Sequence, residues 1–406
     1  MFENIRIRRI VEGSTPYWIP DPEYYGKPGR YIPMDLPIFY NPNMEINRDL
    51  SLLAIQVYSE LYDIPLHEIY YIEALAGTGI RGFRAINELG PINVILNDIN
   101  PLCCRFMQFN SRFFPPQARS HVTMLNHDAS YLLCQIKYWI RPMDIVDIDP
   151  FGTPAPYIDP AMRALKRKHG MLLVTATDTA ALIGKFEKSC LRKYGSWLSP
   201  TLFSGEIGVR ALVYYIFKIS TKYGVGLKPI FGMFFGGFIK AGFISIPGRK
   251  NADRLWRRVG WISVRDQNVD IVDLHSPKPP GSKILGPLWI GELFDANYMN
   301  EAIKLLPNLP ISPNSKKKLE RIFRSEVNVY WIPFYYNLEY IASSLRIPTP
   351  KTDAIVMMLR EDGYIAERTH FDSKAIKTNA PIDAVIKVMG EITDRRRDNR
   401  AQTARR

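Results

Sequence analysis

The sequence predicts an α/β domain built on a parallel sheet, followed by a smaller α+β domain. Between residues 69 and 250, short apolar runs alternate with segments of helical periodicity. Each apolar run ends in polar residues, which is typical of parallel strands with covered faces. A glycine-rich turn joins the first run to a helix. Such turns bind ligands at the carboxyl edge of open α/β sheets, so we expect a site there.

The elements of this domain are expected in a regular order. Residues 1–45 are rich in Pro, Tyr and Gly and show little periodicity, which predicts an extended arm or a set of loops. A helix is expected to begin near residue 46, with Asn47 as its cap. A closing hairpin is expected at 228–246. The parallel strands are expected at 69–75, 92–96, 122–125, 145–148 and 171–175.

The chain has 406 residues, enough for two or three domains. A change in composition after Pro247-Gly248 divides it into residues 1–250, 251–394 and an Arg-rich, flexible tail at 395–406. In the second part, apolar spacing predicts helices at 316–323, 338–345 and 352–359 and a strand at 364–369. This order of helices, turn and strand resembles a winged helix.

The formal net charge is +13, from 53 Lys and Arg against 40 Asp and Glu. Such an excess indicates a polyanionic partner, either nucleic acid or a membrane surface. The tail contributes +5 through six Arg and one Asp, and the remaining body carries +8. Charge alone does not choose between the two partners.

Cysteine content and hydropathy indicate the compartment. The four Cys include no CxxC pair, so neither a disulfide framework nor a zinc knuckle is expected, and a reducing compartment follows. The longest apolar stretch, residues 229–239, is shorter than the ~20 residues that span a bilayer. The first eleven residues are charged and lack a signal-peptide core. We therefore expect a cytoplasmic protein without membrane segments.

A glycine-rich loop follows the first expected strand. Gly77-x-Gly79-x-x-Gly82 has the spacing of a dinucleotide-binding loop, and Asp98 lies 21 residues after Gly77. A carboxylate at the end of the second strand accepts hydrogen bonds from ribose hydroxyls. A nicotinamide-dependent enzyme is therefore one interpretation of the loop.

Two further acids favour S-adenosylmethionine instead. Glu73 ends the first strand, where it would repel a pyrophosphate but suit the cationic methionyl group. Asp128 ends the third strand and is followed by the small Ala129. This pair suits the amino group of an adenine and leaves room for its ring. The alternative is a plain turn with a capping Asp.

The fourth strand ends in Asp147-Ile148-Asp149-Pro150-Phe151-Gly152. Asp149 can accept a hydrogen bond from an amino group conjugated to a purine and take up its proton. Pro150 stiffens the turn, and Phe151 offers a face for stacking an extruded base. The turn resembles the Asp/Asn-Pro-Pro-aromatic motif of amino-methyltransferases, but its aromatic residue comes one position earlier and the second Pro is missing. The alternative is a Pro-stopped strand with a solvated Asp.

Several long segments, in the same order, closely resemble the tRNA (guanine-N2)-dimethyltransferases that act at position 26. The resemblance covers most of the chain, including "EGSTPYWIP", "FYNPNMEINRDLS", "EALAGTGIRGFRA", "NDINP", "DIDPFGTP", "VTATDTAAL", "GEIGVRAL", "GPLWIG" and "RTHF". It implies a class I, Rossmann-like methyltransferase domain with an additional C-terminal domain that binds tRNA. It also implies S-adenosylmethionine as the cofactor and transfer of one and then two methyl groups to guanine N2.

The resemblance also assigns residues to the site. Asp149 falls on the family's catalytic acid, and Phe39 and Phe151 fall on aromatic residues that sandwich the guanine. The cofactor positions are Arg48, Arg81, Asp98, Asp128 and Ala129. The residues themselves add Glu73, Gly77 and Gly79 to the cofactor loop and Pro150 to the catalytic turn. A guanidinium at residue 48 could hold the cofactor's carboxylate bidentately.

One departure concerns metals. Many family members carry two Cys pairs before the "GPLW" segment, but the C-terminal part of this chain has no Cys, and His275 alone is no ligand set. No metal is therefore expected. Two alternatives remain, an amino-methyltransferase acting on rRNA guanine or DNA adenine, and a nicotinamide-dependent enzyme. The sequence does not determine the oligomeric state, although a monomer is slightly favoured.

Overall fold

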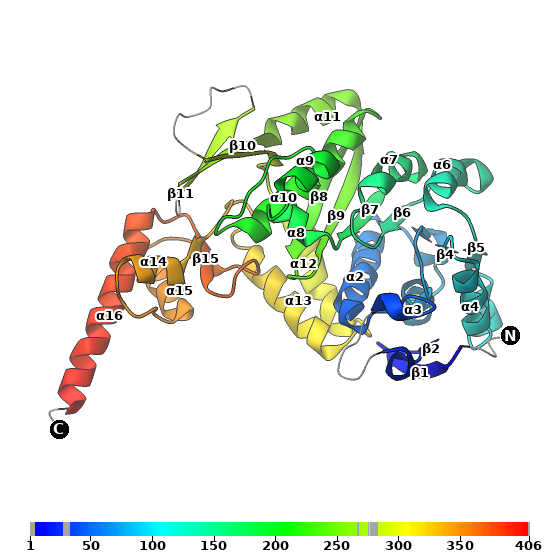
Figure 1. Cartoon of the computed structure of the whole chain (residues 1–406), viewed down its shortest axis with the longest axis horizontal. Helices are drawn as coiled ribbons and strands as arrows, with labels where there is room; N and C mark the ends of the chain where they lie inside the picture. The colour runs from blue at the N-terminus through cyan, green and yellow to red at the C-terminus, as the bar shows by residue number, and fades with distance from the viewer. Residues whose placement is uncertain (1–4, 27–32, 266–267, 275, 277–282, 405–406) are drawn as a thin grey trace.

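A computed structural model describes residues 5–26, 33–265, 268–274, 276 and 283–404 (Figure 1). Its centre is a seven-stranded sheet with the order β5-β4-β3-β6-β7-β9-β8. Neighbours among β3 to β7 run parallel, whereas β9 is antiparallel to both β7 and β8. The strands are β3 (Tyr70–Glu73), β4 (Asn93–Asn97), β5 (Val122–Leu125), β6 (Ile145–Ile148), β7 (Met171–Ala176), β8 (Val225–Phe234) and β9 (Ile239–Pro247).

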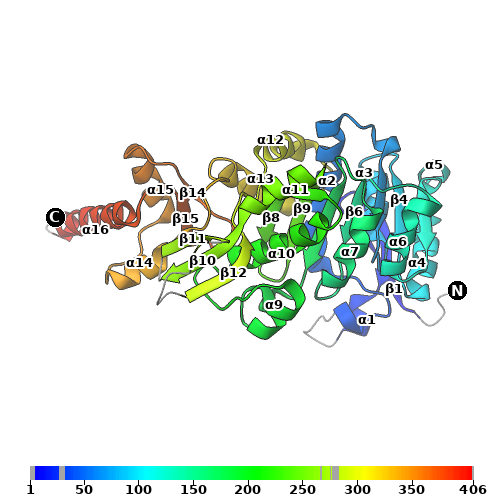
Figure 2. The ribbon, with the colours of Figure 1, turned by 90° about the horizontal axis from the view of Figure 1, so that it is seen from above.

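All five parallel strands and the closing hairpin that the sequence predicts are confirmed, with strand ends that differ by at most two residues and hairpin ends that differ by at most three. Every residue of β6 and β7 is buried, because helices cover both faces of a parallel sheet. One layer contains α6 (Ala129–Trp139), α7 (Ala155–Ala164) and α10 (Ser204–Thr221). In the other, α2 (Glu45–Tyr62) packs against α3 (Ile80–Glu88) and α12 (Ala296–Leu305) (Figure 2).

The start of α2 differs from the prediction. The helix begins at Glu45, two residues before the expected cap, and the side chain of Asn41 caps the preceding short turn, Pro42–Met44. Asn47 therefore lies inside the helix and is fully buried. Its side chain is available for a contact with the sheet rather than with its own helix.

The N-terminal segment is more regular than expected. Strands β1 (Ile7–Glu12) and β2 (Thr15–Pro20) form an antiparallel hairpin, so the expectation of an extended arm or loops is wrong for this part. Alternate residues of β2, including Tyr17 and Ile19, are buried against the main core. A period of two over six residues is the signal of a half-buried strand. The turn needs Gly13, whose φ is +59°.

The chain beyond residue 250 packs in two ways. A three-stranded sheet of β10 (Val259–Arg265), β11 (Asn268–Asp273) and β12 (Lys283–Trp289) contributes buried side chains to the same core as the large sheet, as does α13 (Pro313–Glu326). A second core lies between residues 338 and 392. The boundary after residue 250 stays a prediction.

The second core includes the elements that the sequence predicts, together with a strand and a helix that it does not predict. Helices α14 (Leu338–Ser344) and α15 (Thr352–Glu361) are followed by β14 (Ala366–Arg368). This strand forms a sheet with β13 (Tyr336–Asn337) and β15 (Ala375–Thr378), in the order β13-β15-β14. The last helix, α16 (Ile382–Ala404), continues through most of the expected tail. That residues from 395 onward form a separate flexible tail stays a prediction. In the described residues, no helix is both long and apolar enough to cross a membrane.

Candidate active site

The glycine-rich loop lies between β3 and α3, at the carboxyl edge of the sheet. Gly77 and Gly79 adopt φ of +55° and +79°, which side chains rarely tolerate. A Cβ on Gly79 would lie 2.7 Å from the side chain of Met107. The backbone N–H of Gly77 donates to Asp98 Oδ2 at 2.8 Å, so the carboxylate after β4 holds the loop directly. The predicted proximity of loop and carboxylate is thus observed.

Glu73, the last residue of β3, is 4% exposed. Among the described residues, none forms a hydrogen bond with its Oε1 atom. Burial raises the pKa of Glu73 to about 8, although the nearby charge of Arg81 acts in the opposite direction. A buried carboxyl oxygen without a partner suits a cationic ligand, and the methionyl ammonium of S-adenosylmethionine is such a group. The residues present therefore fit this cofactor.

Asp128 and Ala129 lie where β5 leads into α6. The carboxylate of Asp128 accepts a hydrogen bond from the Tyr131 N–H at 2.9 Å and thereby caps the helix. The capping alternative is thus correct for one oxygen of this residue. Ala129 is 3% exposed. Their role at an adenine ring stays a prediction.

Asp149, directly after β6, is held from two sides. Arg81 forms an ion pair with Asp149 Oδ2 and a second ion pair with Asp147 Oδ2, the latter at 2.8 Å. The amide nitrogen of Asn47 lies 3.3 Å from the same Oδ2 of Asp149. Both contacts thus involve one oxygen of the Asp149 carboxylate. Arg81, predicted to bind the cofactor, contacts the catalytic turn instead, and its role toward the cofactor stays a prediction.

The contacts continue beneath the turn and close into a ring. Asn47 also donates to Thr175 Oγ1 at 3.2 Å, and Lys240 Nζ donates to the same oxygen at 3.2 Å. Lys240 then pairs with Asp147 Oδ1 at 2.8 Å, and Arg81 leads back to Asp149. The ring therefore joins α2, α3, β6, β7 and β9 under one carboxylate.

The charges in this ring are balanced. Lys240 is fully buried, and burial lowers its pKa although Asp147 acts in the opposite direction. Burial would raise the pKa of Asp147, but the charges of Arg81 and Lys240 lower it overall. Two carboxylates thus face two cations in a region shielded from water. Such an arrangement holds each side chain in one position, because a buried charge cannot be left without a partner.

Phe39 and Phe151 lie together, as the sequence predicts for a pair around one base. Their ring centroids are 4.2 Å apart and their planes meet at 89°. Phe151 is 59% exposed. The turn behind it is fixed by two hydrogen bonds between Gly152 and Thr177, at 2.7 and 2.9 Å. The turn is therefore anchored on the loop after β7, while its aromatic ring remains accessible.

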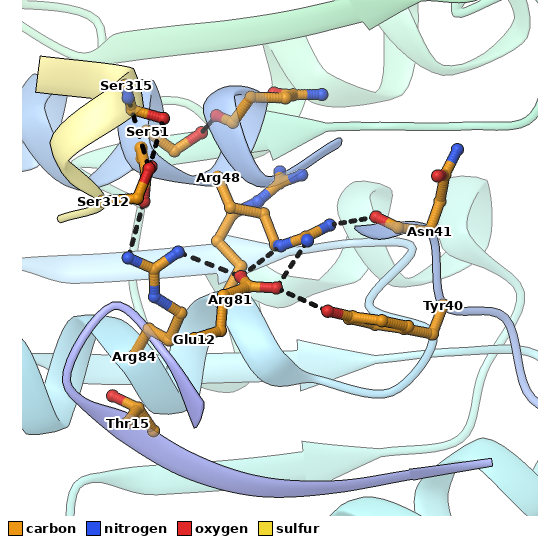
Figure 3. A network of polar contacts seen from close by, with 12 residues as sticks. Glu12, Thr15, Tyr40, Asn41, Arg48, Ser51, Arg81, Arg84, Ser312 and Ser315 are labelled. Carbon is orange, nitrogen blue, oxygen red and sulfur yellow. Dashed lines mark hydrogen bonds and ion pairs between the residues drawn. The ribbon is translucent and has the colours of Figure 1, made fainter. Parts of the chain in front are cut away.

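Arg48 lies in a second polar network, at the N-terminal hairpin (Figure 3). Its guanidinium forms a bidentate ion pair with Glu12, with two distances of 2.6 Å, and also donates to the carbonyl of Asn41. Tyr40 donates to the same carboxylate at 2.9 Å. The bidentate face expected to hold the cofactor's carboxylate therefore binds Glu12. A role of Arg48 toward the cofactor stays a prediction, and it requires Arg48 to exchange Glu12 for the cofactor's carboxylate.

Arg84 completes this second network. Its side chain is fully buried and pairs with Glu12, Asp49 and Glu88 at 2.6 to 2.9 Å. Burial would raise the pKa of Glu12, but the charges of Arg48 and Arg84 lower it overall. The network thus joins the β1–β2 hairpin to α2 and α3. It explains why the N-terminal segment is ordered on the domain.

Sequence reasoning missed Asn47, Thr175 and Lys240 as members of the site. A signal exists for Lys240, a single charged residue within the apolar β9 strand. No signal distinguishes Asn47 from a helix cap or Thr175 from an ordinary strand residue. Within the described part of the chain, no group of three His, Cys, Asp or Glu side chains is placed to hold a metal ion, and His275 lies outside that part.

Comparison with known proteins identifies the family. Residues 18–390 match the family described as N2,N2-dimethylguanosine tRNA methyltransferase. The chain is 34% identical over 390 residues to the tRNA (guanine(26)-N(2))-dimethyltransferase of Methanocaldococcus jannaschii, covering 95% of this chain and 99% of that protein. The corresponding enzyme of Thermococcus kodakarensis is 31% identical over 371 residues, covering 88% and 94%.

A solved structure agrees with this result. Trm1 from Pyrococcus horikoshii, in complex with S-adenosyl-L-methionine, superposes with a TM-score of 0.80 at 29% sequence identity. The match covers 94% of this chain and 99% of that one. The shared fold includes the Rossmann-like sheet and the additional C-terminal part. The chain therefore belongs to the family of N2,N2-dimethylguanosine tRNA methyltransferases.

Proposed function

We propose that the chain methylates the exocyclic N2 of guanosine 26 in tRNA, giving first N2-methylguanosine and then N2,N2-dimethylguanosine. The observation that carries the proposal is the position of Asp149. Its carboxylate lies at the carboxyl edge of the sheet, and Arg81 and Asn47 both contact its Oδ2 atom. Among the described residues, no hydrogen bond or ion pair involves the other oxygen, Oδ1, which would accept a hydrogen bond from the amino group of the base.

The cofactor would bind along β3, β4 and β5. Glu73 offers its unpartnered carboxyl oxygen to the ammonium, and Asp98 offers carboxylate lone pairs to the ribose hydroxyls. Asp128 and Ala129 would bind the adenine. S-adenosylmethionine supplies an electrophilic methyl group on its sulfonium when it is bound. Glycine at positions 77 and 79 permits the positive φ that shapes the loop.

The protein's contribution to the chemistry is positioning and proton removal. The N2 lone pair of guanine is delocalised into the ring, and a hydrogen bond from N2–H to Asp149 localises it on nitrogen. Asp149 then takes up the proton that methylation releases. Pro150 stiffens the turn, and Phe39 and Phe151 stack the extruded base between them. The second transfer requires that the same pocket admit the methylated amino group.

Two measurements test the proposal. Calorimetric titration should show that S-adenosylmethionine binds and that NAD does not. Tight binding of NAD would contradict the choice of S-adenosylmethionine as the cofactor. Incubation with tRNA and S-adenosylmethionine should give mono- and dimethylguanosine in nucleosides separated by mass. A tRNA with adenosine at position 26 should give neither product. If rRNA or DNA were methylated while tRNA stayed unmethylated, the proposal that tRNA is the substrate would be wrong.

A further inference from the structure

The loops at the carboxyl edge of the sheet follow one another in a fixed spatial order. Strands β5, β4 and β3 carry the proposed cofactor residues, and β6 carries the catalytic turn. The next strand, β7, leads into α8 (Thr179–Leu182) and α9 (Glu187–Tyr194). Because parallel strands end at one edge, α8 and α9 lie beside the catalytic turn on the side away from the cofactor. This segment is therefore a neighbour of the turn at which a base would be inserted.

Direct contacts fasten α9 to the catalytic turn. The hydroxyl of Tyr194, at the end of α9, lies 2.8 Å from Thr153 Oγ1 in the turn. It donates to Asp178 at 2.6 Å, and Lys193 pairs with the same carboxylate at 2.9 Å. Tyr194 is fully buried. The position of α9 relative to Asp149 is therefore set by hydrogen bonds as well as by packing.

The outer face of α9 is basic and aromatic. Lys185, Lys188 and Arg192 are exposed, and Glu187 is the single acid between Lys185 and Tyr194. Lys188 and Arg192 are four residues apart, so they lie on the same face of the helix. Two aromatic side chains flank them, Phe186 at 62% exposure and Trp197 at 44%. Figure 2 shows α9 at the border of the molecule.

We propose that residues 185–197 form an RNA-binding surface, the α9 surface, which binds tRNA phosphates beside the flipped base. The inference rests on the proposed function and adds to it the place where the substrate is held. Lysine and arginine neutralise phosphates, and exposed aromatic rings stack on unpaired bases. Cations with exposed rings on one short segment suit an RNA rather than an acidic protein, because a protein offers no bases to stack.

The test compares two double variants that remove the same charge from similar helices. Lys188→Ala/Arg192→Ala alters the α9 surface. Lys250→Ala/Arg254→Ala is the control, because these exposed residues are also four apart on a helix, α11 (Arg249–Leu255). Helix α11 follows β9, which is antiparallel to β7, so it lies at the opposite edge of the sheet. Binding of S-adenosylmethionine by calorimetry checks that both variants are folded.

The readout is the affinity for tRNA at several salt concentrations. A lost phosphate contact lowers the slope of log affinity against log salt by about 1. We expect the α9 variant to lower the slope by about 2 and to weaken binding, while the control changes it by less than 0.5. Lys188→Arg/Arg192→Lys should restore the wild-type slope, because it keeps both charges.

Each failure has its own meaning. If the wild-type protein methylates tRNA but the α9 variant and the control lower the slope equally, the α9 surface is overturned and the proposed function stands. An unchanged slope in the α9 variant has the same meaning. If the wild-type protein binds but does not methylate tRNA, the proposed function fails, whatever the slopes show.

Discussion

The rings of Phe39 and Phe151 touch edge to face, with centroids 4.2 Å apart. A purine stacked between two rings needs them about 7 Å apart, twice the contact distance of carbon atoms. The pair must therefore open to admit a base. The turn that carries Phe151 is anchored on Thr177, so the movement is expected in the segment that carries Phe39.

This geometry predicts that the Phe151 ring contributes one stacked face to base binding. Phe151→Ala should weaken productive binding of the base by about 1–3 kcal/mol, the loss of one stacked face. Phe151→Tyr keeps the face and should retain most of the activity. The measurement is the single-turnover rate as a function of enzyme concentration. Equal activity of Phe151→Ala and wild type would show that the ring does not stack the guanine.

Asp149 is expected to act directly on the amino group. Asp149→Asn keeps the shape of the side chain but replaces an acceptor oxygen with a donor and removes the capacity to take up a proton. The single-turnover methylation rate should fall by at least ~10²-fold, the scale of lost acid–base assistance. Affinity for tRNA, measured by filter binding, is the control. A near-normal rate would exclude the role of Asp149 as proton acceptor.

The raised pKa of Glu73 predicts that folding stability depends on pH. Its pKa is about 8 in the folded protein because of burial, whereas it is about 4.3 in an unfolded chain. Between these values the folded state holds a proton that the unfolded state has lost. The free energy by which protonated Glu73 stabilises the folded state is therefore fully present below pH ~4 and is lost as the pH rises through about 8.

The corresponding experiment uses Glu73→Gln. In the wild type without cofactor, the free energy of unfolding in urea should fall between pH 5.5 and 8.5, on the order of a few kcal/mol. Glu73→Gln, which is neutral throughout, should flatten this part of the profile. Binding of a cationic ligand at pH 7 should also release a proton. Calorimetric enthalpies that do not depend on the buffer would argue against pairing with Glu73.

Lys240 and Asp147 form a fully buried ion pair 2.8 Å long. Lys240→Met leaves Asp147 with Arg81 as its remaining cation, so the free energy of unfolding should fall by about 3–5 kcal/mol. The control is Lys228→Met on β8, where an exposed lysine pairs with Asp295 at 2.5 Å. That change should cost at most about 1 kcal/mol.

A second variant separates charge from packing. Lys240→Met/Asp147→Asn removes both charges of the pair and should recover part of the stability lost in Lys240→Met. Methylation should stay impaired in the double variant, because Arg81 would then pair with Asp149 alone. If Lys240→Met lowered the free energy of unfolding no more than the control Lys228→Met, the ring would not be a buried charge network in solution.

Much of the site could be predicted from the sequence because it depends on local order. Apolar runs identified the parallel strands, and polar residues at their ends identified Asp98, Asp128 and Asp149. In a parallel sheet all these ends meet at one edge, so position along the chain is enough to place them together. The glycine spacing identified the loop for the same reason, since backbone conformation is a local property.

The tertiary structure alone decided which buried polar groups are partners. Asn47, Thr175 and Lys240 come from three distant segments, and Arg48 meets Glu12 through the hairpin that the sequence had not predicted. A buried charge or amide must find a partner, but the fold decides which one, because the partner is near in space rather than in sequence. The sequence thus determined the edge, the loop and the position of the Asp149 carboxylate. Only the packing of helices on the sheet decided how that carboxylate is held.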